Sequence, residues 1–240
     1  MSKIENIRQN LRTDGYVLVK KFFLKTKEFE NFKKFLQQTI KLTSSNKIKN
    51  IDKFLSTKFK NDKTVSAYLN DNINLSHYLS SLLVSKKLIS FLSKIFRENQ
   101  KRIIFNNPRF RIQIPGNDAI ANLPWHQDIV YNKIKSSKSI VAWISLGDIS
   151  KEMGPIIFKK GSHKFGIQKI FKIKKKNDNF VFNVNTNNKN LKNLPNIQFN
   201  TLSGDLILID MNTVHTSGRN NTKDKVKFSA QARYHVLKKF

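Results

Sequence analysis

Residues 204–215 read GDLILIDMNTVH, a short apolar run bounded by a turn and a histidine. Residues 206–210 have the length and composition of a buried strand, and Ser203-Gly204 before them is a turn signal. His215 stands just beyond the end of this run. The segment therefore predicts a core strand that carries a histidine at one end.

Short β-rich runs of this kind recur along the chain after about residue 101. They occupy residues 102–114, 139–146, 155–158, 179–184, 206–210 and 226–237. Turn signals separate them at Pro115-Gly116, Gly154-Pro155 and Gly161-Ser162. Many short strands after a helical start favour helices packed on a β-sandwich or barrel over a doubly wound parallel sheet.

The first hundred residues predict mainly helix. After a short helical lead-in, a turn at Asp14-Gly15 precedes a strand within residues 11–23. Apolar residues at three- and four-residue spacing predict helices over residues 25–42 and 78–97. Residues 46–74 are polar and read as irregular.

We therefore expect one domain over residues 1–240, with helical support in 1–100 and a β core in 101–240. A Lys/Asn-rich surface insertion is expected at about 169–196, between two core strands. This insertion and residues 46–74 are the expected lids and substrate contacts.

Composition narrows the classes of protein. The 240 residues include 19 Phe and are 39% hydrophobic, which is enough for a packed core. There are no cysteines, which excludes a disulfide framework, a zinc–thiolate site and a thiol nucleophile. The first ten residues lack the apolar stretch of a signal peptide, and no run approaches the ~18 apolar residues of a membrane span. We expect a cytoplasmic protein.

The formal net charge of +29 raises the question of nucleic-acid binding. The basic residues are scattered, however, and no helix-turn-helix, RNP-like or zinc-finger pattern accompanies them. This distribution disfavours nucleic acid as a partner. A small, acidic substrate fits the charge better.

A second group of candidate ligands lies in residues 124–128, which read PWHQD. Residues two apart on a strand point to the same face, so His126 and Asp128 can address one ion together. With His215 they make two histidines and one carboxylate, the facial triad of non-haem iron(II) oxygenases, which leaves three metal positions open. The alternative is that both histidines are merely satisfied polar residues.

Five blocks of this sequence resemble the phytanoyl-CoA dioxygenase (PhyH-like) family of Fe(II)- and 2-oxoglutarate-dependent oxygenases. They are DGYVLVKKFF at 14–23, LPWHQD at 123–128, AWISL at 142–146, GPIIFKKGSHK at 154–164 and GDLILIDMNTVHTSGRN at 204–220. The resemblance covers nearly the whole chain. It implies a mainly β fold with flanking helices, in which a double-stranded β-helix (jelly-roll) core follows N-terminal α-helices.

The resemblance also implies Fe(II) held by His126, Asp128 and His215, with 2-oxoglutarate as co-substrate and O2 as oxidant. The implied reaction hydroxylates a C–H bond of a small metabolite or lipid-like acyl group and releases succinate and CO2. A catalytically inactive jelly-roll protein that binds a metal or ligand, or senses one, is the alternative.

The resemblance further implies a cationic residue, about eleven positions after His215, that binds the distal carboxylate of 2-oxoglutarate. That position holds Val226, and one inserted residue brings Lys227 into register, with Lys225 and Arg233 as alternatives. Lysine offers a point charge where arginine offers a planar two-pronged contact. Ser217 matches the family position whose hydroxyl assists the same carboxylate.

Residues 109–114 read RFRIQI, with polar residues at alternate positions. Arg109, Arg111 and Gln113 therefore share one face of the predicted strand. A polar face inside a barrel usually lines a ligand cavity, so Gln113 is a candidate partner of 2-oxoglutarate, while a solvated outer face is the alternative for Arg109. Trp143 is a candidate to pack along the co-substrate, with plain core packing as the alternative.

Overall fold

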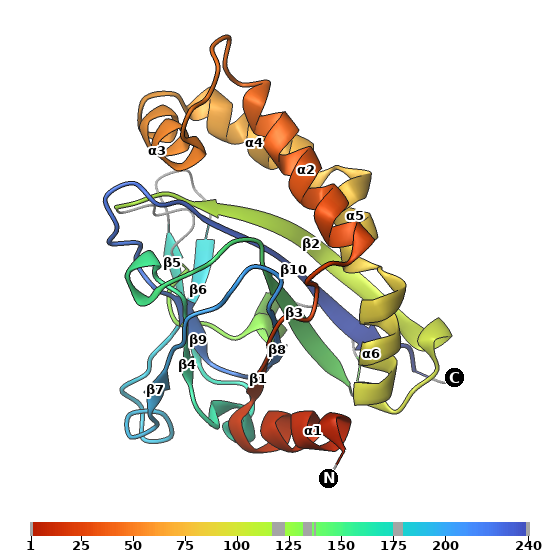
Figure 1. The fold of residues 1–240 in the computed structure, drawn as a ribbon. Helices are drawn as coiled ribbons and strands as arrows, with labels where there is room; N and C mark the ends of the chain where they lie inside the picture. The colour runs from red at the N-terminus through yellow and green to blue at the C-terminus, as the bar shows by residue number, and fades with distance from the viewer. Residues whose placement is uncertain (1, 117–122, 132–135, 137, 175–179, 239–240) are drawn as a thin grey trace.

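The computed structural model describes residues 2–116, 123–131, 136, 138–174 and 180–238. It places two antiparallel sheets face to face and a group of helices against the outer side of the larger sheet (Figure 1). The larger sheet has the strand order β1-β8-β3-β10-β2. Its strands are β1 (Tyr16–Val19), β2 (Ile103–Gln113), β3 (Ser139–Ser145), β8 (Leu206–Asp210) and β10 (Lys227–Val236).

The smaller sheet has the order β7-β4-β9, made of β7 (Asn196–Ile197), β4 (Ile156–Lys159) and β9 (His215–Ser217). Strands β5 (Ile170–Lys174) and β6 (Phe180–Val184) form a separate hairpin. Early and late strands alternate within the larger sheet, as they do in a jelly-roll. The predicted fold class, a mainly β jelly-roll core with N-terminal helices, is confirmed.

Both faces of the larger sheet are buried, which explains the continuous apolar run in β8. Leu206 and Leu208 face the helices, whereas Ile207 and Ile209 face the smaller sheet. In β3, Trp143 faces the smaller sheet with the second pair. Alternate residues of one strand thus enter two different cores.

Helices α2 (Lys27–Lys41), α4 (Lys63–Asn74), α5 (His77–Leu83) and α6 (Lys86–Phe96) lie along the side of β2 and β10 that faces away from the smaller sheet (Figure 1). Helix α1 (Lys3–Asp14) packs beside β1, and α3 (Ile51–Asn61) lies next to α4. No helix among the described residues is long and apolar enough to cross a membrane.

Two helix predictions are corrected. Residues 46–74 are not irregular but contain α3 and α4. Most residues of these helices are polar, and only a few apolar ones, such as Leu55, Leu69 and Ile73, are buried. Residues 78–97 form two helices, because Ser85 adopts an extended conformation and ends the helical run. Leucines on both sides of the break pack into the same core, so the apolar spacing continues across it.

The insertion expected on the surface at 169–196 is exposed only in part. Strand β5 is largely exposed, but Val184 at the end of β6 and Leu191 are buried against Val214. The backbone N–H of Val184 donates to the carbonyl of Trp125 at 2.7 Å. This hydrogen bond holds the insertion next to the PWHQD segment.

Candidate metal centre

The two candidate histidines are placed by backbone hydrogen bonds. His126 and His215 form an isolated antiparallel bridge, in which the N–H of His126 donates to the carbonyl of His215 at 2.9 Å and the reverse bond measures 3.0 Å. Their imidazole centroids lie 4.3 Å apart. Two distant segments thus present their imidazoles side by side.

Asp128 reaches the same place by a different local structure from the one the sequence suggested. It is the first residue of a 3-10 turn, Asp128–Tyr131, and not the continuation of a strand. The turn brings its carboxylate under the imidazoles, with Oδ2 3.4 Å from Nε2 of His215. The three side chains lie close together, but the strand alternation from which this was predicted is wrong.

Both imidazoles have a backbone acceptor on the same ring nitrogen. Nδ1 of His126 lies 2.7 Å from the carbonyl of Pro124, and Nδ1 of His215 lies 2.9 Å from the carbonyl of Thr213. A carbonyl only accepts, so each Nδ1 carries the proton and each Nε2 keeps a lone pair. Burial, followed by the nearby His215, lowers the pKa of His126 to about 3, which keeps this ring neutral.

The Asp128 carboxylate is held in its ionised form. Burial by itself raises the pKa of Asp128, but the interactions of its carboxylate with His215 and Arg233 outweigh burial, and the pKa is lowered. Arg233 donates to Oδ1 from Nε at 2.9 Å and from a terminal nitrogen as well. Oδ1 is thus occupied, and Oδ2 faces the histidines.

These three residues fit a metal ion. One ligand atom from each of His126, Asp128 and His215 lies within 4.8 Å of the others, and all three residues are buried. Two imidazole nitrogens and one carboxylate on a single face match the donor set of non-haem iron(II) sites. Their role as ligands stays a prediction that the geometry supports.

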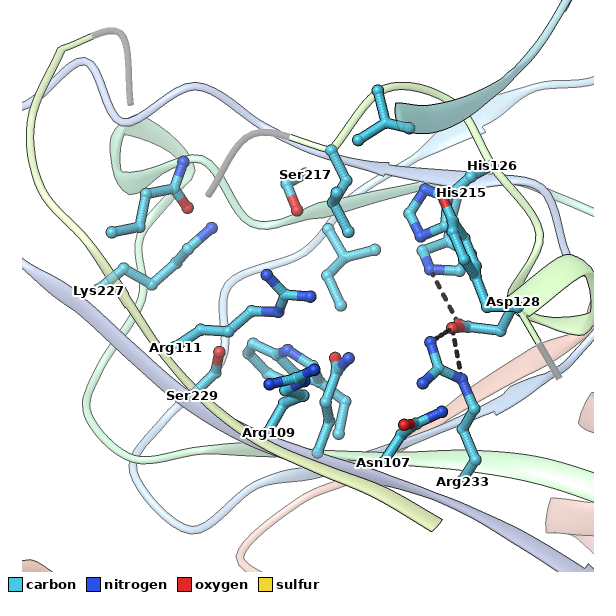
Figure 2. Close-up of a pocket in the computed structure, with 17 residues that line it drawn as sticks. Asn107, Arg109, Arg111, His126, Asp128, His215, Ser217, Lys227, Ser229 and Arg233 are labelled. Carbon is cyan, nitrogen blue, oxygen red and sulfur yellow. Dashed lines mark hydrogen bonds and ion pairs between the residues drawn. The ribbon is translucent and has the colours of Figure 1, made fainter. Parts of the chain in front are cut away.

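The donors open into a cavity of about 340 Å³ between the two sheets. Strands β2 and β10 line it with alternate residues, which are Asn107, Arg109, Arg111, Gln113, Lys227, Ser229, Gln231 and Arg233. Figure 2 shows Lys227 and Arg111 on one side of this cavity and Asp128 with Arg233 on the other. None of the described residues that line it comes from 46–74, so the lid expected there is not found.

All four residues predicted to contact 2-oxoglutarate line this cavity: Lys227, Ser217, Gln113 and Trp143. The Lys227 ammonium donates to the carbonyl of Gly154, and Nε2 of Gln113 donates to the carbonyl of Gly218 at 2.9 Å. Burial, and then the Arg111 charge, lower the pKa of Lys227 to about 7. Their contact with a co-substrate stays a prediction.

The alternatives to Lys227 are placed differently. Val226 is buried in the core, and Lys225 is exposed and does not line the cavity. Arg233 lines it but is engaged with Asp128. Of Lys225, Lys227 and Arg233, only Lys227 both lines the cavity and makes no ion pair with Asp128.

Gln127 is a supporting residue that the sequence analysis missed. It is fully buried, and its amide nitrogen donates to the carbonyls of Gly166 at 2.9 Å and Asn212 at 2.6 Å. Its amide oxygen accepts the N–H of Gln168 at 2.8 Å. No local sequence pattern signals this role, because residues 126–128 lead into a 3-10 turn and do not form a strand.

The turn before His215 is fixed to the N-terminal segment. The Thr213 hydroxyl and the Asp210 N–H both donate to the carbonyl of Gly15 at 2.8 Å. Gly15 has φ +85°, and a Cβ there would lie 2.4 Å from the Thr213 hydroxyl oxygen. The glycine permits this close approach, which links the DGY block to the second histidine.

A jelly-roll core that carries two histidines and a carboxylate on one side of a buried cavity defines the class of facial-triad proteins. The sequence model of the family described as phytanoyl-CoA dioxygenase (PhyH) matches residues 11–227. This chain belongs to that family. No curated protein matches it in sequence.

Solved structures share the fold at low sequence identity. The epimerase SnoN in complex with Fe3+, alpha ketoglutarate and nogalamycin RO has a TM-score of 0.68 and 17% identity, over 97% of this chain and 83% of SnoN. The non-heme monooxygenase ThoJ has a TM-score of 0.64 and 16% identity, over 96% and 77% of the two chains. EvdO2 from Micromonospora carbonacea var. aurantiaca, complexed with 2-oxoglutarate, has a TM-score of 0.64 and 13% identity, over 99% and 91%.

Proposed function

We propose that this chain is an Fe(II)- and 2-oxoglutarate-dependent oxygenase that hydroxylates a C–H bond of a small, acidic molecule. The observation that carries this proposal is the shared orientation of three donors. Nε2 of both histidines and Oδ2 of Asp128 are directed to one point, while their other polar atoms are held by the protein.

His126, Asp128 and His215 would hold the metal. Backbone carbonyls fix both imidazole tautomers, and Arg233 fixes the carboxylate. Such supporting hydrogen bonds orient the ligands, and their loss usually lowers metal affinity about 10- to 100-fold. The chain thus supplies both the ligands and the contacts that position them.

Bound iron would supply the activation of O2, coupled to oxidative decarboxylation of 2-oxoglutarate. In the balanced reaction, one oxygen atom of O2 enters succinate and the other converts the substrate C–H into C–OH, with release of CO2. The residues of the chain have the task of holding both reactants and keeping water out. Trp143, Leu123 and Ile156 give the cavity its apolar walls for that purpose.

Lys227 and Gln113, which lie opposite each other on β10 and β2, would bind the co-substrate together with Ser217 of β9, since all three line the cavity. The acidic character of the substrate is inferred from the charges that remain. The described lining contains four cationic side chains, Arg109, Arg111, Lys227 and Arg233, and one carboxylate, Asp128. Arg109 is exposed at the cavity, where it can meet an entering anion.

The same proposal treats the 240 residues as one functional unit. The larger core cluster includes α2 residues such as Phe32 and β10 residues such as Ala230. The helices therefore bury the outer face of the sheet whose inner face lines the cavity. Helical and β parts would depend on each other for stability.

Anaerobic reconstitution tests the proposal. Purified protein would be mixed with Fe(II) and 2-oxoglutarate and inspected for the weak visible charge-transfer band of such chelates. We expect the band in the wild type and no band in His126→Ala. When O2 is admitted, the wild type should form succinate. Absence of the band at saturating 2-oxoglutarate would reject the proposal.

A catalytically inactive ligand-binding or sensor protein is the second candidate, and the lysine at position 227 is the feature that favours it. It predicts metal and 2-oxoglutarate binding without succinate on exposure to O2. An epimerase-type outcome, the activity of SnoN, would consume 2-oxoglutarate without adding a hydroxyl to the product. Mass spectrometry of the product formed under 18O2 separates this outcome from hydroxylation.

A further inference from the structure

Arg111 is a largely buried cation that forms no ion pair with a described residue, and the charge of Asp128 favours it only from a distance. Its side chain projects from near the carboxyl end of β2 into the cavity (Figure 2). Among the residues that the structure describes, none forms a hydrogen bond or ion pair with its guanidinium. A buried charge is strongly unfavourable unless it is paired. The side chain is therefore placed for a partner that comes from outside the chain.

Lys227 is the nearest cation on the neighbouring strand. In the β2–β10 register, Arg111 lies opposite Ser229 and Lys227 lies opposite Gln113. Arg111 and Lys227 are thus diagonal neighbours on one face, a spacing that long side chains bridge. Their proximity is unfavourable, since the Arg111 charge helps to lower the pKa of Lys227 after burial itself.

The one carboxylate among the described lining residues favours the Arg111 charge from a distance but pairs with neither Arg111 nor Lys227. Asp128 is already bound by Arg233 and faces His215 through its other oxygen. Figure 2 shows Arg111 reaching into the space between Lys227 and this group. Two like charges therefore border a space that an anionic group would fill favourably.

We propose that Arg111 and Lys227 together bind the distal carboxylate of 2-oxoglutarate, with Arg111 supplying the planar two-donor contact and Lys227 a single charge. This inference rests on the proposed function. It transfers the carboxylate-binding guanidinium from the last core strand, where Lys227 stands, to the adjacent strand β2. A bidentate guanidinium contact is stronger and more directional than an ammonium contact.

The location favours the co-substrate over a carboxylate of the substrate. Ser217 lies two residues beyond His215 on β9, and Figure 2 shows its side chain between the two histidines and Lys227. A dicarboxylate that reaches from the metal ligands past Ser217 places its far end between Arg111 and Lys227. Arg109 remains, farther from Lys227 along β2, for another anion.

Calorimetric titration of the Mn(II)-loaded protein without O2 tests the inference. The probes are 2-oxoglutarate and 2-oxopentanoate, which has the same chain length and no distal carboxylate. We expect Arg111→Gln to weaken 2-oxoglutarate binding about 10- to 100-fold, the range for a charged hydrogen-bonded contact. Binding of 2-oxopentanoate should be unchanged in the same variant.

Lys225→Gln is the matched control, because it removes one positive charge next to β10 at an exposed position outside the cavity. We expect it to bind both probes as the wild type does. If Arg111→Gln and Lys225→Gln lost equal 2-oxoglutarate affinity, the loss would come from the lower net charge of the protein. That result would overturn the inference. Unchanged 2-oxoglutarate affinity in Arg111→Gln would overturn it as well.

Thermal unfolding supplies a readout that is independent of ligand titration. Without ligand, Arg111→Met should melt at a higher temperature than the wild type, because an unpaired buried charge is removed. Added 2-oxoglutarate should raise the melting temperature of the wild type more than that of this variant. A lower melting temperature for ligand-free Arg111→Met would show that the guanidinium serves the fold, against the inference.

Failure of the proposed function has a different signature. If the wild type binds Mn(II) but binds neither probe, or binds no Mn(II), the proposed function fails. If the wild type prefers 2-oxoglutarate to 2-oxopentanoate and Arg111→Gln keeps that preference, only the role of Arg111 fails. Where Arg111→Gln loses that preference, Arg111→Lys should restore part of it, because a single positive charge is regained.

Discussion

His126 and His215 exchange two backbone hydrogen bonds, of 2.9 and 3.0 Å, and their imidazoles lie side by side. The relative position of the two candidate ligands is therefore set by the main chain, not by the imidazoles. Each ring is then oriented by the carbonyl two residues before it. Metal binding and folding should accordingly be separable by mutation.

We predict that His126→Ala and His215→Ala each abolish measurable Fe(II) binding while the fold persists. Loss of a ligand should exceed the roughly 10- to 100-fold effect of losing a supporting partner. Competition with a chromophoric chelator measures the affinity, and circular dichroism checks the fold. His77→Ala is the control because His77 is exposed on α5; a comparable loss of affinity there would contradict the prediction.

Arg233 should matter to the metal through Asp128 alone. In Arg233→Met, the Asp128 carboxylate loses two hydrogen bonds and a neighbouring charge, so Fe(II) affinity should fall about 10- to 100-fold. The same chelator competition measures this change. Arg219→Met, at an exposed arginine, should leave the affinity unaltered. Wild-type affinity in Arg233→Met would remove the arginine from the site.

The candidate metal site could be predicted from the sequence because its donors are few and chemically specific. The two blocks PWHQD and GDLILIDMNTVH carry all three donors. The support of that site could not be predicted in the same way. Arg233 and Asp128 meet only through the packing of β10 against a 3-10 turn, and nothing in the local sequence of either residue specifies the other.

The helical half shows a similar limit. The apolar spacing of α2 predicted it within a few residues, since its buried face is rich in Phe and Leu. Helices α3 and α4 were missed because a few buried residues, such as Leu55 and Leu69, interrupt long polar stretches. Helix α4 packs against β2 and α3 packs against α4, and a local sequence pattern contains neither neighbour.

Gln127 should contribute to stability and only indirectly to chemistry. Gln127→Leu leaves the carbonyls of Gly166 and Asn212 and the N–H of Gln168 without this partner. Unsatisfied buried groups cost about 1–3 kcal/mol each, so we expect the free energy of unfolding to fall by roughly 3 kcal/mol in total. Urea denaturation of the metal-free protein measures it, and a change below ~1 kcal/mol would contradict the role.

Lys227 predicts a specific pH dependence of stability without ligand. Its pKa is lowered from 10.5 to about 7 by burial and then by Arg111. Between these two pH values the unfolded chain binds more protons at this residue, so its contribution to stability rises with pH. Lys227→Met should therefore be more stable than the wild type at pH 7, by a few kcal/mol, and this gap should shrink toward pH 10.

Urea denaturation at pH 7, 8.5 and 10 tests this dependence, since the difference between wild type and Lys227→Met cancels the other titrating groups. A gap that stays constant over this range would show that Lys227 is not a buried cation. At pH 7 with Mn(II) and excess 2-oxoglutarate the order should reverse, because the carboxylate then pairs with the ammonium and stabilises the wild type.

Gly154 positions the backbone that receives Lys227. It has φ +68°, and a Cβ there would lie 2.3 Å from the carbonyl oxygen of Gly218. That carbonyl accepts the amide of Gln113, while the carbonyl of Gly154 accepts the Lys227 ammonium. Gly154→Ala should therefore separate the two loops and lower stability by more than about 2 kcal/mol.

The displacement should also weaken 2-oxoglutarate binding, because the two carbonyls hold Lys227 and Gln113, which we propose as its ligands. Gly147→Ala is the matched control, since a Cβ at Gly147 meets nothing within 4 Å. Calorimetry of both variants with Mn(II) separates the effects. If Gly154→Ala is destabilised but keeps wild-type 2-oxoglutarate affinity, then Lys227 and Gln113 hold their positions without these carbonyls, and the loop pair serves the fold alone.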